Sequence, residues 1–172
     1  MAAKHLLIVL RHGKSLWDTA ALNDFERPLS PRGSREIPLI AHWLRDHCAT
    51  VGAMISSPAR RAYESALLAA HVLEFPSSKI HFDRRLYNAG PQDWVKVLED
   101  VALADRVLVA IGHNPGLEDF LSFVCQEDLP RREDGKILTT AAAAGISNAK
   151  PWTKVSRGCG QLQFLMRPAD IA

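Results

Sequence analysis

One short stretch near the N-terminus constrains the fold more than any other part of the sequence. Residues 6–10 are five consecutive large aliphatic residues, and Arg11, His12 and Gly13 follow them directly. An unbroken aliphatic run of this length is typical of a strand that is buried on both faces within a parallel sheet. The next three residues then fall at the carboxyl end of that strand, where open α/β sheets bind their ligands.

These three residues have the chemistry of an anion site. The guanidinium group of Arg11 offers a planar set of donors that suits phosphate or carboxylate. The imidazole of His12 can act as a nucleophile, a base or a metal ligand, and Gly13 lets the backbone turn sharply or approach a ligand closely. Ordinary strands also end on polar residues, so the hypothesis of a functional site depends on partners elsewhere in the chain.

The bulk properties predict a single globular domain that spans residues 1–172. This length is sufficient for one hydrophobic core, and a content of 47% hydrophobic and 23% charged residues is ordinary for a globular protein. The net charge of +2 is too small to indicate binding to nucleic acid or to a membrane surface. No apolar run approaches the roughly 20 residues that cross a bilayer. We therefore expect neither nucleic acid nor a membrane as a partner.

The cysteines indicate a cytoplasmic location. Cys48, Cys125 and Cys159 are odd in number and widely spaced, which fits neither a disulfide framework nor a zinc site. Free thiols are typical of the reducing cytoplasm. Residues 1–5 are too short to form the front of a signal peptide before Arg11 interrupts the apolar run.

Strand and helix patterns alternate along the chain. This alternation predicts an α/β fold, namely a three-layer α/β/α sandwich with a mostly parallel central sheet. The last two strands have no helix between them, so we expect antiparallel pairing at one edge, near the C-terminus. The predicted strands are 6–10, 51–56, 80–82, 107–111, 137–146 and 161–166, and the predicted helices are 31–47, 58–73, 91–101 and 117–124.

Two Ser-Pro pairs, at residues 30–31 and 57–58, mark predicted helix starts. In each pair the serine is expected as the N-cap and the proline as the first helical residue. Pro38 lies inside the first of these helices and predicts either a kink or a start delayed to Ser34.

Two further segments carry matching side chains to the end of the predicted sheet. The aliphatic run 107–111 leads to a second histidine, His113, and strand 51–56 leads to Arg60 and Arg61 in the first turn of a helix. If these strands neighbour the first one, two imidazoles and at least two guanidinium groups converge. The helix N-terminus adds free N–H groups and a positive dipole. The sequence therefore predicts one oxyanion site.

Three blocks of sequence resemble a known family. Residues 10–17 (LRHGKSLW) resemble the signature of the histidine phosphatase (phosphoglycerate mutase-like) superfamily. Residues 56–66 (SSPARRAYESA) resemble its second block, with Ser65 where threonine is usual, and residues 112–116 (GHNPG) resemble the third. The short chain, the stretch 24–29 (DFERPL) and the form of the third block are most similar to SixA-type phosphohistidine phosphatases.

This resemblance implies a hydrolase in which His12 is the nucleophile that becomes phosphorylated. Arg11, Arg61 and His113 would bind the phosphoryl group, whose charge spreads over three oxygens in the transition state. The family block has its arginine directly before the alanine, which selects Arg61 over Arg60 and leaves Arg60 as a solvated residue. No carboxylate–histidine cluster has the spacing of metal ligands, so we expect no metal and no other cofactor.

Attack by His12 requires a neutral imidazole. We therefore expect its other ring nitrogen to donate a hydrogen bond to a carbonyl oxygen. Nearby cations should lower the pKa of the imidazole and keep it neutral.

Substrate binding is further assigned to Ser15, Asp18 and Asn114. Asp18 stands where many relatives have an asparagine, and a carboxylate there would repel phosphate unless Lys14, Arg27 or another cation offsets it. Alternatively, Asp18 is protonated and is itself the general acid. A loop aspartate that makes only a local turn bond is the third interpretation.

The expected substrate follows from a second departure from the family. Mutase-like relatives carry a glutamate general acid two residues after the leucine that corresponds to Leu86, and this chain has Asn88 there. An amide cannot protonate a leaving alkoxide, whereas protonated phosphoimidazole leaves as neutral imidazole and needs far less help. The short chain also has little length for covering segments, which predicts an open, shallow cleft able to receive a folded protein.

The sequence thus predicts a phosphohistidine phosphatase that acts in signal transduction. Its partner would be a phosphorylated protein, with a histidine-containing phosphotransfer protein as one candidate. A phosphatase for small phosphomonoesters that also uses His12 is the first alternative. A non-catalytic phosphate-binding module is the second, although such a module has no need for a nucleophile.

Overall fold

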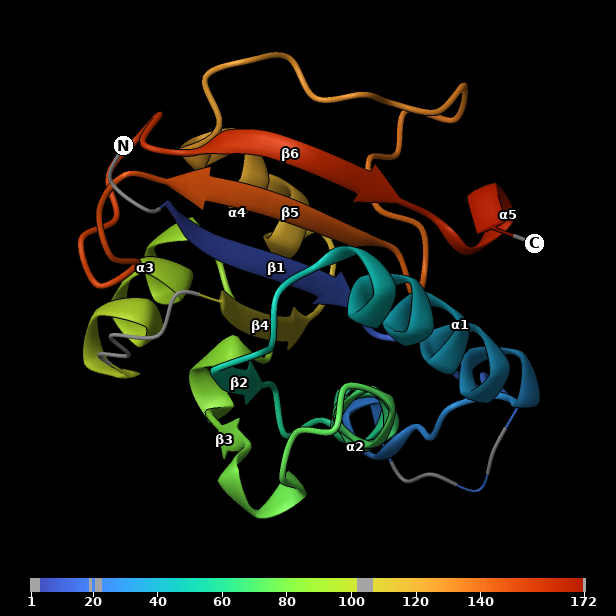
Figure 1. Ribbon diagram of the computed structural model, residues 1–172. Helices are drawn as coiled ribbons and strands as arrows, with labels where there is room; N and C mark the ends of the chain where they lie inside the picture. Colours follow the sequence, from blue (N-terminus) through green and yellow to red (C-terminus); the bar gives the residue numbers. More distant parts are fainter. Residues whose placement is uncertain (1–3, 19, 21–22, 102–106, 172) are drawn as a thin grey trace.

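A six-stranded sheet lies at the centre of the computed structural model, which describes residues 4–18, 20, 23–101 and 107–171 (Figure 1). The strand order across the sheet is β3-β2-β4-β1-β5-β6. The strands are β1 (His5–Arg11), β2 (Ala53–Ser56), β3 (His81–Phe82), β4 (Val107–Gly112), β5 (Ala143–Asn148) and β6 (Gln161–Met166).

The sheet is mixed, with its parallel and antiparallel parts separated. β1 pairs with β4, β4 with β2 and β2 with β3, all in parallel. β5 runs antiparallel to β1 on one side and to β6 on the other. The predicted architecture, a mostly parallel sheet with antiparallel pairing near the C-terminus, is confirmed.

Side chains of β1 alternate between two hydrophobic cores. Leu7 and Val9 belong to one core and Ile8 and Leu10 to the other, and all four are fully buried. A strand can bury both faces only if helices cover the sheet on both sides. The aliphatic run 6–10 therefore has the role that its composition predicts.

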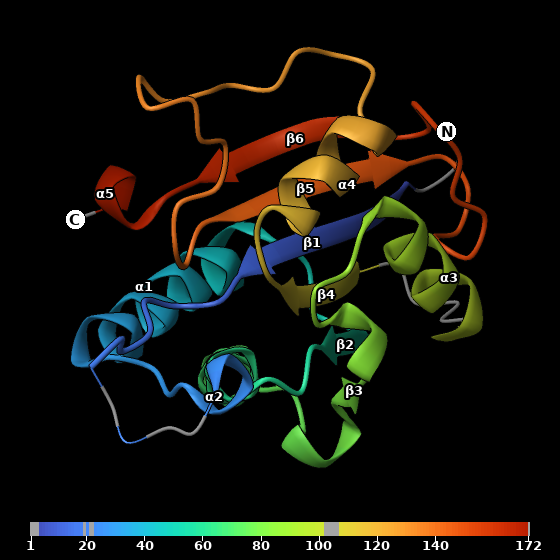
Figure 2. The same ribbon diagram turned by 180° about the vertical axis from the view of Figure 1, so that it is seen from behind.

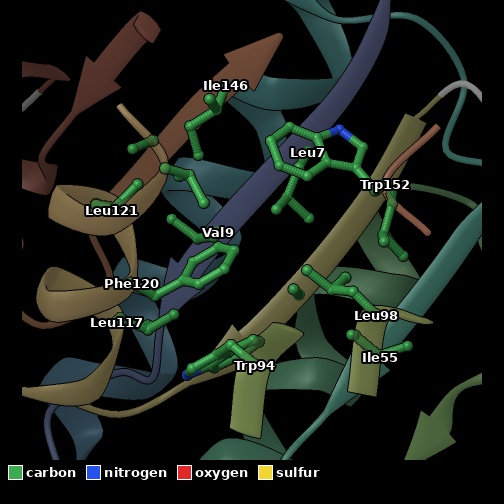
Figure 3. Close-up of a cluster of buried hydrophobic side chains, with 14 of the residues drawn as sticks. Leu7, Val9, Ile55, Trp94, Leu98, Leu117, Phe120, Leu121, Ile146 and Trp152 are labelled. Carbon is green, nitrogen blue, oxygen red and sulfur yellow. The ribbon is translucent and has the colours of Figure 1, made fainter. Parts of the chain in front are cut away.

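Two pairs of helices complete the three layers. The second core, around Ile8, is closed by α1 (Pro31–His47) and α2 (Arg60–Val72), and the first core is closed by α3 (Pro91–Val101) and α4 (Gly116–Val124). Figures 1 and 2 show α1 and α4 on opposite sides of the sheet. Phe120 of α4 lies beside Val9 in the first core (Figure 3), and the ring of Trp94 of α3 lies 5.8 Å from that of Phe120, measured between centroids. Among the described helices, none combines the length and apolar character that a bilayer crossing requires.

Short elements complete the chain. A last helix, α5 (Pro168–Ile171), follows β6. Three 3₁₀ turns are also present: η1 (Asp24–Glu26), η2 (Ser77–Lys79) and η3 (Arg84–Leu86). The turn η1 lies next to the candidate site, as does Tyr87, which directly follows η3.

One predicted helix start is correct and another is wrong. α1 begins at Pro31, with the Ser30 hydroxyl accepting a hydrogen bond from the Gly33 N–H at 3.1 Å, so its start is not delayed. α2 begins at Arg60 instead of at Pro58, and its N-cap is Ala59, which makes no side-chain bond, instead of Ser57. The Ser57 hydroxyl has other partners, which belong to the candidate site.

The predicted strand 137–146 is also corrected, because β5 begins only at Ala143. Ile137 and Leu138 are buried but are not in a strand. Their N–H groups donate to the carboxylate of Glu118, at 3.1 and 2.8 Å. A side chain therefore supplies the acceptor that a neighbouring strand would otherwise provide.

Candidate active site

The four residues predicted to bind a phosphoryl group converge at the carboxyl ends of three neighbouring strands. Arg11 ends β1, His12 and His113 follow β1 and β4, and Arg61 lies in the first turn of α2, after β2. The ring centroids of the two histidines are 5.0 Å apart. Nε of Arg61 lies 3.3 Å from Nε2 of His12. The predicted meeting of the two imidazoles with Arg61 is therefore present.

His12 is held as a neutral imidazole. Its Nδ1 lies 2.7 Å from the carbonyl oxygen of Gly13, and because that oxygen can only accept, Nδ1 carries the proton, as expected. Nε2 is then unprotonated, and its lone pair accepts a long hydrogen bond from Nε of Arg61. Burial lowers the pKa of His12 well below its usual value, and the nearby His113, Arg61 and Arg11 lower that pKa further.

His113 is held by a serine. Its Nε2 lies 2.8 Å from the Ser57 hydroxyl oxygen, which also accepts a hydrogen bond from the Ala59 N–H at 3.2 Å. In the tautomer in which the Ser57 hydroxyl donates to Nε2, Nδ1 of His113 carries the ring proton, and this buried nitrogen has no partner within the described parts of the chain. Burial, with Arg61 next in effect, lowers the pKa of His113 to about 3.

The adjacent arginines of α2 differ as predicted in exposure. Arg61 is buried and faces His12, whereas Arg60 is exposed and its Nε donates to Glu64 at 2.8 Å. Arg11 is partly buried, and its Nη1 donates to the carbonyl oxygen of Leu138 at 2.8 Å. Its Nε is a buried donor with no partner among the described residues.

An aspartate that the sequence did not single out, Asp24 of η1, joins this cluster. Its carbonyl oxygen and its Oδ2 accept hydrogen bonds from Nη1 and Nη2 of Arg61, at 2.7 and 2.9 Å. Tyr87 and Arg27 also donate to the carboxylate, each at 2.8 Å. Burial alone would raise the pKa of Asp24, but the hydrogen bonds from Tyr87, Arg61 and Arg27 outweigh it and lower the pKa to about 2.

The three residues assigned to substrate binding lie further out. The Ser15 hydroxyl accepts a hydrogen bond from Arg27 at 2.6 Å, and the Asn114 amide donates to Glu118 and to the carbonyl oxygen of Leu138, at 2.8 and 3.0 Å. Asp18 is exposed. Among the described residues, no hydrogen bond or ion pair joins these three side chains to the four-residue cluster. Their role in substrate binding stays a prediction.

Ser65, which replaces the usual threonine, connects the loop after β1 to α2. Its hydroxyl accepts a hydrogen bond from the Gly13 N–H at 3.0 Å and donates to the carbonyl oxygen of Arg61 at 2.6 Å. One sign of this contact is present in the sequence, because Ser65 stands in the second family block at the position where threonine, which also has a hydroxyl group, is usual. Ser57 and Asp24 also lie in the quoted stretches, but their types alone gave no sign of their contacts.

The donors that meet at this site suit an oxyanion. Nε2 of His12 lies next to Arg61, and the second imidazole and the guanidinium group of Arg11 are close enough to lower the pKa of His12. This gathering of guanidinium and imidazole groups suits the binding of an oxyanion. Across the described parts of the chain, no group of three or more His, Cys, Asp or Glu side chains is placed to hold a metal ion.

Comparison with known proteins identifies the family. The model of the histidine phosphatase superfamily (branch 1) matches residues 7–109. A protein from Mycobacterium tuberculosis (strain H37Rv), itself described as uncharacterized, is 31% identical over 157 residues, which cover 89% of this chain and 96% of that protein.

Solved structures share the fold at low sequence identity. A candidate phosphohistidine phosphatase, SixA from Nakamurella multipartitia, has a TM-score of 0.80 and 19% identity, with 97% of this chain and 98% of that chain covered. The protein histidine phosphatase SixA complexed with tungstate has a TM-score of 0.79 and 22% identity, with 97% and 99% covered. The family model covers more than half of the chain and includes Arg11, His12 and Arg61. The chain therefore belongs to the histidine phosphatase superfamily, branch 1.

Proposed function

We propose that this phosphatase removes the phosphoryl group from phosphohistidine on a protein, through a phosphorylated intermediate on His12. The observation that carries the proposal is the neutral form of His12. Its Nδ1–H donates to the Gly13 carbonyl oxygen, and its Nε2 is unprotonated and lies near cationic side chains. A neutral, oriented imidazole is what nucleophilic attack on phosphorus requires.

In the first step Nε2 of His12 attacks phosphorus, and the bond between phosphorus and the substrate nitrogen breaks as the new bond forms. Nε of Arg11 and Nδ1 of His113 are buried and have no partners among the described residues, which makes them available to the phosphoryl oxygens. Nδ1 serves as a donor in the tautomer in which the Ser57 hydroxyl donates to Nε2. Together with Arg61 they neutralise charge on the three oxygens in the transition state. The substrate histidine leaves as neutral imidazole if its phosphoimidazole was protonated.

In the second step water attacks the phosphorus of phosphorylated His12. The bond to Nε2 breaks, inorganic phosphate leaves, and the imidazole returns to its neutral state. The proton that water loses is carried away by phosphate or by solvent. The same donors from Arg11, Arg61 and His113 serve this step, because the phosphoryl group has the same three oxygens.

The ionisation of the site supports phosphohistidine over an alkyl phosphate. Asp24 is the carboxylate that is hydrogen-bonded to Arg61, and with a pKa of about 2 it is ionised and cannot donate a proton at neutral pH. Asn88, at the position of the family's glutamate acid, is an exposed amide. A leaving group that departs as neutral imidazole suits such a site. The structural likeness to two SixA proteins, one of them a protein histidine phosphatase, is consistent with this choice.

The partner that we propose is a phosphorylated protein, with a histidine-containing phosphotransfer protein as one candidate. Such a reaction would belong to signal transduction and to the cytoplasm, in keeping with the three free cysteines. We further propose that Ser15, Asp18 and Asn114 contribute to binding this substrate.

Trapping the phosphorylated enzyme tests the proposal. The wild type and His12→Ala are each mixed with a ³²P-phosphohistidine phosphotransfer domain, with p-nitrophenyl phosphate and with a sugar phosphate, and then quenched. We expect an acid-labile, alkali-stable label on the wild type alone, fastest turnover of the phosphohistidine protein, and no effect of EDTA on the rate. Equal turnover of the sugar phosphate would favour a small-molecule phosphatase. Binding without turnover would favour a phosphate-binding module.

A further inference from the structure

The guanidinium group of Arg61 is held at three points of unequal strength. Nη1 and Nη2 donate to the carbonyl oxygen and to Oδ2 of Asp24, at 2.7 and 2.9 Å. Nε donates to Nε2 of His12 over the longer distance of 3.3 Å. Hydrogen bonds between charged groups are the stronger type. Asp24 therefore fixes the outer end of Arg61, while the contact with His12 is easily exchanged.

Asp24 is itself fixed by its surroundings. The turn η1 is closed by the Asn23 side chain, which accepts a hydrogen bond from the Glu26 N–H at 3.1 Å. Arg27 donates to Oδ1 of Asp24 and Tyr87 donates to Oδ2, each at 2.8 Å. Donors from three separate parts of the chain thus hold one carboxylate, although its side chain is 49% exposed. An ionised carboxylate with this many donors is a rigid anchor.

The weak contact between Arg61 and His12 has to be broken during the reaction. Nε2 of His12 is the nucleophile of the proposed function, so phosphorus must come to the place beside Nε2 that the Nε–H of Arg61 faces. With both Nη atoms held on Asp24, the guanidinium group can turn only slightly. The Nε–H then moves from the nucleophile to a phosphoryl oxygen. An unanchored arginine side chain has many rotamers and would need to be ordered in each turnover.

We propose that Asp24 is a positioning residue that anchors Arg61 and so directs its Nε–H to the transferring phosphoryl group. The proposal rests on the proposed function only in taking His12 as the nucleophile. It carries an electrostatic consequence, because a carboxylate this close to the anion site repels a bound oxyanion. Asp24 thus favours the transition state through Arg61 while it disfavours ground-state binding of phosphate.

These opposed effects make the proposal testable. The variants are Asp24→Ala and Asp24→Asn, and Glu26→Gln is the matched control because it removes a charge from the same turn at an exposed residue. The rate of His12 phosphorylation is measured by rapid quench with p-nitrophenyl phosphate. The inhibition constant of inorganic phosphate is measured in parallel.

We expect Asp24→Ala to slow phosphorylation by roughly 10- to 100-fold, as for a misplaced catalytic group, with an inhibition constant for phosphate that is unchanged or lower. Asp24→Asn keeps an oxygen acceptor and should lose less of the rate, and Glu26→Gln should leave both quantities within about twofold of the wild type. Circular dichroism melting confirms that each variant is folded.

Two results would overturn the proposal. If the Asp24 variants weaken phosphate binding as much as they slow phosphorylation, Asp24 only maintains the local structure. If they react as fast as the wild type or faster, Asp24 only competes with the substrate for Arg61. A wild type that forms no phosphohistidine on His12 would instead refute the proposed function and, with it, the mechanism by which Asp24 acts.

Discussion

The hydroxyl oxygen of Ser57 lies 2.8 Å from Nε2 of His113, and the two residues are 56 positions apart in the sequence. The Ala59 N–H donates to the same oxygen. When the hydroxyl proton points to Nε2, the ring proton of His113 lies on Nδ1. We infer that this contact selects the Nδ1–H tautomer of His113. A neutral histidine therefore presents a donor to the anion site even though its pKa is only about 3.

Replacing Ser57 with alanine should impair His113 without unfolding the protein. The substitution leaves the buried Nε2 without a partner, which costs about 1–3 kcal/mol of stability, and lets the imidazole adopt the other tautomer. We expect kcat to fall by about tenfold. A double-mutant cycle checks the cause, because Ser57→Ala should change kcat little in a His113→Ala background. An equal loss in both backgrounds would place the role of Ser57 elsewhere.

Arg60 and Arg61 form a matched pair for mutation. Arg61→Ala removes a buried donor that faces His12, and we expect kcat/KM to fall by about 10²- to 10³-fold, as for an oxyanion-hole donor. Arg60→Ala breaks only an exposed ion pair with Glu64, which is worth well under about 1 kcal/mol. Its kcat/KM should stay within about twofold. A larger loss from Arg60→Ala would mean that Arg60 contacts the substrate.

The two site histidines make the free energy of unfolding depend on pH. Their pKa values are lower in the folded protein than the ordinary value of 6.5, with that of His113 at about 3. The unfolded chain therefore binds more protons below pH 6.5, so stability is complete above that pH and decreases as the pH falls toward 3. At pH 5.5 the protonation of His113 in the unfolded chain should lower the free energy of unfolding by about 1 kcal/mol, and His12 should lower it further.

Urea unfolding at pH 5.5 and pH 7.5 measures this loss. His113→Gln provides the comparison, because it cannot be protonated in the unfolded chain. The difference in unfolding free energy between the two pH values should be smaller in this variant by about 1 kcal/mol. The same difference in both proteins would mean that His113 is not held neutral.

Local sequence patterns were sufficient for the sheet and for the central cluster. The aliphatic runs before Arg11 and His113 indicate strands buried on both faces, and the carboxyl ends of parallel strands meet at one edge. The convergence of His12, His113 and Arg61 therefore followed from the order of the elements. The choice between Arg60 and Arg61 came from the family motif.

The contacts that sequence reasoning missed join distant parts of the chain. A serine before a proline has the pattern of a helix N-cap, but the Ser57 hydroxyl is bound to His113. Asp24 meets Arg61 across 37 positions, and no local pattern encodes that distance. Ile137 and Leu138 have the burial of strand residues, whereas their N–H groups are satisfied by Glu118.

The leaving group offers the sharpest test of the substrate class. Without a carboxylic acid at residue 88, the rate should fall steeply as the pKa of the leaving group rises, with phosphohistidine best, aryl phosphates intermediate and alkyl phosphates poor. Asp18→Asn examines the remaining candidate acid. This variant should keep its activity, and it should bind phosphate no more weakly than the wild type, if Asp18 makes only a local turn bond. Loss of sugar-phosphate hydrolysis on this change would identify Asp18 as the acid.

Restoring the acid should change the order of substrates. General acid catalysis is typically worth about 10²- to 10⁴-fold, so Asn88→Glu should accelerate alkyl-phosphate hydrolysis and leave phosphohistidine turnover almost unchanged. Asn88 has a φ of 57°, a conformation that asparagine tolerates and glutamate adopts at a cost of roughly 1–2 kcal/mol. Asn88→Gln carries the same backbone strain without a carboxyl group and is therefore the control. If both variants alter alkyl-phosphate hydrolysis equally, the backbone at residue 88 is responsible, and the missing acid does not explain the choice of substrate.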